Sequence, residues 1–64
     1  MKLSTACTLR LVTGGWEHEV VVSLTSATHT FTIIRNQTEK PTAAELCADV
    51  LRATEAALNQ ENKP

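Results

Sequence analysis

Residues 40–45 read Lys-Pro-Thr-Ala-Ala-Glu, and the spacing of the apolar residues changes at this point of the chain. Before it, apolar residues alternate with threonine, serine and charged residues, which is the pattern of half-buried strands. After it, alanine, leucine and valine recur every three or four residues for about four helical turns. The sequence therefore predicts a small sheet followed by one helix.

The start of the helix is marked by a capping box. Thr42 has the side chain of an N-cap residue, and Glu45 stands three positions later, where it can reach back to the first free backbone amide. We expect the helix over about residues 43–59 and a frayed tail over 60–64. The expected buried stripe is Ala43, Leu46, Cys47, Val50, Leu51, Thr54, Ala57 and Leu58, and the residues expected to face water are Glu45, Asp49, Arg52, Glu55 and Asn59.

Three strands are predicted, over about residues 3–12, 16–25 and 28–35. Gly14-Gly15 and Ser26-Ala27 are the expected two-residue loops. Both loops place the apolar sets of the three strands on one side of the sheet, whereas a slip of one residue would turn a whole strand over. The pairs that follow are Leu9 with Val20, Cys7 with Val22, Val22 with Phe31, Val20 with Ile33, Arg10 with Glu19 and His18 with Arg35.

The predicted fold class is α+β with the order β-β-β-α, in which one C-terminal helix packs on one face of a three-stranded antiparallel meander. A chain of 64 residues makes a single domain, here residues 1–64. Chains this short bury only about 60% of the surface that they expose when unfolded. Because one helix covers only one face of the sheet, the outer face is expected to meet water or a partner.

Composition limits the partners. Six basic and seven acidic residues give a formal net charge of −1, which argues against a nucleic-acid partner, since such proteins need a basic footprint. No apolar run is long enough to span a bilayer, and the first residues lack the apolar segment of a secretory signal. We expect no membrane partner, a cytoplasmic location and two reduced thiols.

A metal site is not expected. His18 and His29 fall near opposite ends of the sheet, about 20 Å apart by the rise per residue in strands, so one tetrahedral site cannot hold both. Cys7 and Cys47 are expected to be small core residues. Trp16, the single tryptophan, is expected to cover one end of the core. No cofactor is predicted.

Catalysis is not expected either. The run Glu17-His18-Glu19 has the residue types of a general base, but neighbouring side chains in a strand point to opposite faces. No nucleophile stands at a spacing that would complete the arrangement. We predict no catalytic residues and no enzyme.

Two surfaces are candidates for binding a protein. The outer sheet face carries threonines and aliphatic residues with little charge, and flat areas of that kind often mark protein contacts. Acidic residues on the helix edge and on the second strand form the other candidate. The candidate partner-binding residues are Thr8, Val21, Thr30 and Thr32 on the sheet and Glu17, Glu19, Glu45 and Asp49 among the acidic positions.

In size, charge balance and β-β-β-α plan, the chain resembles the small single-domain proteins that phages and mobile elements make against host defences, anti-CRISPR proteins above all. This resemblance implies a non-enzymatic inhibitor that occludes a surface of a larger host complex. It is architectural, so no functional residue is carried over.

Two alternatives remain open. The three strands and the threonine-capped helix also resemble HicB-type antitoxins, although this chain lacks their Pro-Gly-Cys turn. This resemblance implies a homodimeric structural protein. A weak nucleic-acid-binding sheet would act through Lys2, Arg10, Arg35 and Lys40. The sequence leaves the oligomeric state open between monomer and homodimer.

Overall fold

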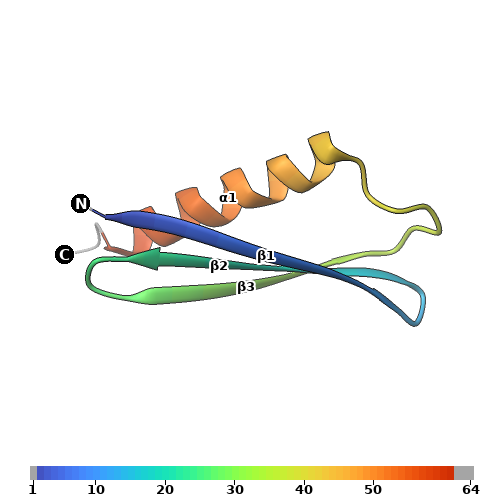
Figure 1. Ribbon diagram of the computed structural model, residues 1–64, viewed down its shortest axis with the longest axis horizontal. Coiled ribbons are helices and arrows are strands. Elements are labelled where there is room, and N and C mark those ends of the chain that lie inside the picture. The colour runs from blue at the N-terminus through green and yellow to red at the C-terminus, as the bar shows by residue number, and fades with distance from the viewer. Residues whose placement is uncertain (1, 62–64) are drawn as a thin grey trace.

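The computed structural model describes residues 2–61 and confirms the predicted α+β fold (Figure 1). Three strands, β1 (Leu3–Val12), β2 (Gly15–Leu24) and β3 (Thr28–Arg35), form an antiparallel sheet in the order β1-β2-β3. The helix α1 (Ala43–Glu61) follows and packs on β2 and β3. The molecule is elongated, with extents of 40 × 19 × 15 Å.

The first hairpin turns one residue earlier than predicted. Its loop is Thr13-Gly14, because Val12 pairs with Gly15, and the pairing of β1 with β2 is shifted by two residues. A side chain at Gly15 would collide with the carbonyl oxygen of Arg35, so this glycine is needed for close approach inside the sheet and not for the turn. Gly14 takes the positive φ of the loop, 86°.

The second hairpin is also shifted by two residues. Ser23 pairs with Thr28, and Leu24 at the end of β2 donates from its amide to the Ala27 carbonyl at 2.8 Å, so the chain turns at Thr25-Ser26. The predicted loop at Ser26-Ala27 was therefore wrong by one residue. Within residues 2–61 only glycines adopt a positive φ, so this turn lacks the geometry of the usual two-residue hairpin loops.

A shift of two residues leaves every strand side chain on its predicted face of the sheet. The predicted fold is therefore correct, although the predicted residue pairs are wrong. The observed pairs are Cys7 with Val20, Leu9 with His18, Arg10 with Glu17, Trp16 with Arg35, His18 with Ile33, Val20 with Phe31 and Val22 with His29.

The core lies under α1 along β2. Val20, Val22 and Leu24 pack with Ala53 and Ala57, and Phe31, Ile33, Val50 and Leu58 surround them. The small alanines allow the helix to approach the sheet closely.

The helix is rotated about its axis relative to the prediction. Asp49, expected to face water, is 1% exposed, whereas Leu51, expected in the core, is 61% exposed. Ala43 and Cys47 are exposed as well. The expected buried stripe was therefore wrong along one side, because Asp49 binds residues of the sheet and turns that part of the apolar stripe away from it.

The capping box at the start of α1 is present. The Thr42 amide donates to Glu45 Oε1 at 2.9 Å, and the Glu45 amide donates to Thr42 Oγ1 at 3.2 Å. The helix continues to Glu61, where the carboxylate accepts hydrogen bonds from Ser26 and His29 of the second hairpin. The rest of the predicted tail, residues 62–64, lies outside the described residues. Within residues 2–61, no helix has the length and hydropathy to cross a membrane.

Candidate functional site

A polar cluster joins α1 to the sheet around Asp49. Asp49 Oδ2 lies 2.9 Å from His18 Nδ1 on β2 and accepts a hydrogen bond of 3.1 Å from Arg35 Nε at the end of β3. Asp49 Oδ1 accepts from Arg35 Nη2 at 2.8 Å and from Arg52 at 3.2 Å. The Asp49 and His18 side chains are 1% and 2% exposed, so the cluster is part of the interior.

The electrostatics of this cluster favour the ionised carboxylate. Burial acts to raise the pKa of Asp49, but hydrogen bonds from Arg35 and His18 outweigh it and hold that pKa below its ordinary value. Conversely, the hydrogen bond to Asp49 raises the pKa of Arg35. The bidentate contact of the guanidinium with the carboxylate gives the pair a defined geometry.

Glu45 extends the cluster to the first turn of α1. Its hydrogen bonds with Thr42 and the nearby charge of Arg35 lower the pKa of Glu45. Arg35 Nη1 lies 3.2 Å from Glu45 Oε2, and Arg35 Nη2 donates to the Glu45 carbonyl at 3.2 Å. One arginine thus connects the end of β3 with two turns of the helix.

The hydrogen bonds of this cluster position α1 on the sheet. Because the Asp49 carboxylate only accepts, Nδ1 of His18 carries the hydrogen in this contact. Within residues 2–61, no hydrogen bond links the imidazole to a hydroxyl or a thiol, and no group of His, Cys, Asp and Glu is arranged to hold a metal ion. His18, which the sequence placed near one end of the sheet, is not solvated there, because α1 covers it.

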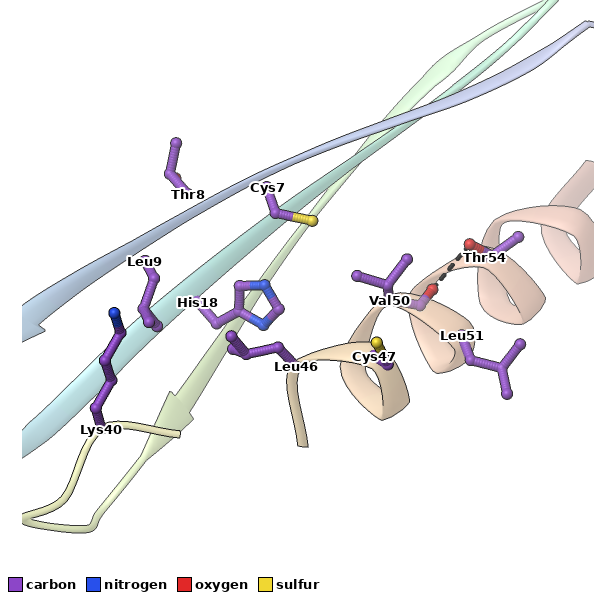
Figure 2. Close-up of a pocket in the computed structure, with 10 residues that line it drawn as sticks. All are labelled: Cys7, Thr8, Leu9, His18, Lys40, Leu46, Cys47, Val50, Leu51 and Thr54. Atoms are coloured by element: carbon purple, nitrogen blue, oxygen red, sulfur yellow. Dashed lines mark hydrogen bonds between the residues drawn. The ribbon is translucent and has the colours of Figure 1, made fainter. Parts of the chain in front are cut away.

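An apolar groove of about 610 Å³ runs between β1 and α1 (Figure 2). Cys7 and Leu9 line it from β1, and Figure 2 shows Thr8 pointing to the opposite side of the strand. The His18 ring lies between the two walls, and Lys40 stands at one end. The helix contributes Leu46, Cys47, Val50, Leu51 and Thr54.

Both cysteines line this groove and are exposed, so their expected place in the core was wrong. The reason is the position of α1, which packs on β2 and β3 and leaves the inner side of β1 uncovered. Leu3 and Leu11, on the same side of β1, are 45% and 69% exposed. Trp16 is half-buried and donates from Nε1 to the Thr38 carbonyl at 3.4 Å.

The outer sheet face brings six of the eight predicted partner-binding residues together. Thr8, Glu19 and Thr32 form one row across the three strands. Ala6, Val21 and Thr30 form the next row on one side, and Arg10, Glu17 and Ile34 form the next on the other. No described element covers these rows, and Ile34 is 53% exposed.

The other two predicted residues, Glu45 and Asp49, lie on the opposite side of the sheet. Asp49 is buried, and Glu45 caps α1 and binds Arg35. The expected acidic helix edge is therefore absent as a free surface at these two positions. On β2, Glu17 pairs with Arg10 at 2.9 Å.

No protein-family model, curated protein or solved structure matches this chain.

Sequence reasoning missed the polar cluster and the groove. A signal for the cluster exists in the helix, where Asp49, Ala53 and Ala57 recur every four residues and form the buried line. One acidic and two small residues on the buried side of a helix indicate that the helix packs closely on the sheet and directs a carboxylate toward it. The arginine that receives it is not marked by any local pattern.

Proposed function

We propose that this chain is a non-enzymatic protein-binding module that acts as an inhibitor of the anti-CRISPR kind, by covering a surface of a larger host complex. The observation that carries this proposal is the bare outer face of the sheet. Three strands present it, and α1 packs only on the opposite face.

The chemistry of the outer face fits a protein surface with little charge that offers one cation or hydrogen-bond donor to Glu19. Its threonine, alanine and valine side chains surround Glu19, which lies in the middle row on the central strand β2, and Ile34 is exposed at one edge. The charged residues nearest to that row include Arg10 and Glu17, which neutralise each other. Such a face can form a mixed polar and apolar contact with a partner that supplies a cation or a hydrogen-bond donor to Glu19, so that no buried charge is left unpaired.

The acidic alternative and the nucleic-acid alternative both lose support from the ion pairs. Asp49 and Glu45 are used inside the molecule, so they do not offer charge to a basic partner. Arg10 and Arg35, two of the four cations that a nucleic-acid site would use, are bound to carboxylates. The outer face therefore takes the role of docking surface in this proposal.

An interference assay tests the function. The chain is expressed in bacteria that carry active CRISPR systems of different types, and the plating of a targeted phage is measured. We expect at least one type to lose interference, with phage plating raised about tenfold or more. If no system loses interference, the inhibitor function is refuted.

Matched variants test the face. Thr30→Arg places a long charged side chain on the outer face beside Val21, whereas Ala48→Arg places the same side chain on an exposed position of α1. Thr30→Arg should abolish both inhibition and binding to the purified complex, and Ala48→Arg should keep both. Equal inhibition by the two variants would contradict the outer face as the docking surface.

A further inference from the structure

The free edge of β1 is long and carries no charge over residues 3–9. Natural edge strands usually carry charged residues, proline or bulges that prevent pairing with another strand. The other edge, β3, differs because α1 packs against its inner side, where Phe31 and Ile33 are half-buried. The inner side of β1 has no such cover, and Leu3 and Leu11 are its exposed leucines.

The backbone groups that face the free edge follow from the hairpin. Val12 and Gly15 flank the two-residue loop, and such a flanking pair exchanges hydrogen bonds. The Lys2 amide, which donates to Thr25 Oγ1 at 3.0 Å, also points toward β2. Even-numbered residues of β1 therefore bond to β2. The amides and carbonyls of the odd-numbered residues point to the open edge, and these are Leu3, Thr5, Cys7, Leu9 and Leu11.

The surface of the isolated chain is larger than its mass predicts. A monomeric protein of this mass exposes about 4,000 Å², whereas this chain exposes 4513 Å². The radius of gyration is 12.7 Å, against about 11 Å for a compact domain of this length. The excess of about 500 Å² is surface that the elongated shape, 40 × 19 × 15 Å, leaves exposed.

We propose that β1 pairs with β1 of a second copy of this chain, antiparallel and about a two-fold axis at Cys7, so that two sheets join into one of six strands. This register places Cys7 opposite Cys7, Thr5 opposite Leu9, and Leu3 opposite Leu11. Residues that pair directly across two strands have their side chains on the same face of the sheet, so in a symmetric pair the two-fold axis must lie between two copies of one residue. Of the possible residues, Cys7 is the one that gives all five odd-numbered residues a partner.

Charge and packing agree with this register. The basic residues at the two ends of the strand, Lys2 and Arg10, fall opposite Val12 and Ser4 of the second copy, so no like charges meet. Leu3 and Leu11, exposed at opposite ends of β1, become direct neighbours across the axis. The β1–α1 grooves of the two copies then lie side by side on the inner face of the joined sheet. The outer faces of the two copies form one continuous surface.

Light scattering with complementary charges tests the pairing and its register. The wild-type chain should be a dimer, and Leu11→Glu should raise the dissociation constant tenfold or more, since it places a carboxylate among leucines. Mixing the Leu11→Glu chain with a Leu3→Lys chain should restore a dimer, because lysine then faces glutamate. Ile34→Glu, an exposed substitution on β3 and on the outer face, should leave the dimer unchanged.

Thiol cross-linking provides an independent measurement. A short bifunctional thiol reagent should join two copies of the Cys47→Ser chain through Cys7, and it should not join two copies of the Cys7→Ser chain. A monomer at about millimolar concentration, failure of the charge pair to restore the dimer, or cross-linking through Cys47 alone would each overturn the proposal. None of these outcomes depends on inhibition, so the dimer and the inhibitor function fail separately.

Discussion

Asp49 Oδ2 lies 2.9 Å from His18 Nδ1, and both side chains are almost completely buried between α1 and the sheet. This contact, with the two hydrogen bonds from Arg35, determines which side of the helix faces β2 and β3. It has a consequence for the whole surface. Because Asp49 occupies the buried side, Cys47 and Leu51 of the apolar stripe are left exposed.

Asp49→Asn should destabilise the protein by about 2 kcal/mol, because it removes the charge that two arginines and His18 share while leaving the volume of the side chain unchanged. Arg35 keeps its contacts with Glu45, which limits the loss. Urea unfolding followed by Trp16 fluorescence measures the change. Glu55→Gln, on the exposed side of α1, is the matched control and should change stability by less than about 0.5 kcal/mol.

Acid should remove the contribution of Asp49. Since the pKa of Asp49 is lowered in the folded protein, its stabilisation is present above the ordinary value of 3.8 and is lost as the pH falls through the lower folded value. Thermal unfolding of the wild type and of Asp49→Asn between about pH 6 and pH 2 measures this. The difference in melting temperature should shrink toward acid, and a constant difference would show that the ionised carboxylate is not the stabilising species.

Ala57→Leu should destabilise the protein by about 1–3 kcal/mol, because Ala57 is fully buried between α1 and β2 and a larger side chain would push the helix from the sheet. Ala48→Leu is the control, since Ala48 is exposed on the same helix. Calorimetry of the two variants measures the difference. Equal melting temperatures would mean that the helix does not approach the sheet closely at this turn.

Gly15→Ala should destabilise the protein more than Gly14→Ala does. A Cβ at Gly15 would meet the Arg35 carbonyl and shift the end of β3, whereas a Cβ at Gly14 meets nothing within 4 Å. The cost at Gly14 is the positive φ of 86°, about 1 kcal/mol for an L-residue. Chemical denaturation of both variants gives the order, and a larger loss at Gly14 would contradict the close approach of β2 and β3.

The sequence was sufficient for the faces of the strands but not for their register. Alternation has a period of two, so Val20 and Val22 stay inside whether the hairpin loop begins at Thr13 or at Gly14. Register depends instead on turn geometry and on backbone contacts such as that of Gly15 with Arg35, which join residues far apart in the chain. Hence the fold was predicted correctly while the individual pairs were displaced.

The candidate surfaces were predictable to different degrees. The outer face follows from alternation alone, and the structure brings its threonines together in adjacent rows. The rotation of α1 was not predictable from hydrophobicity, which places Asp49 in water and Leu51 inside. Asp49 is buried because Arg35, at the end of β3, lies beside the second turn of α1 and binds it. This proximity exists only in the assembled fold and has no local signal in the sequence.

The helix α1 packs along β2 and β3 and leaves the inner side of β1 without cover from its own chain, and both proposed contact surfaces depend on this placement. Methyl nuclear Overhauser effects within one chain, measured with isotope filtering, test it most directly. We expect contacts that link Ala53 and Ala57 with Val20 and Val22, and none between Leu51 and Thr5. Strong contacts between Leu51 and Thr5 in the same chain would place the helix over β1 and contradict the account.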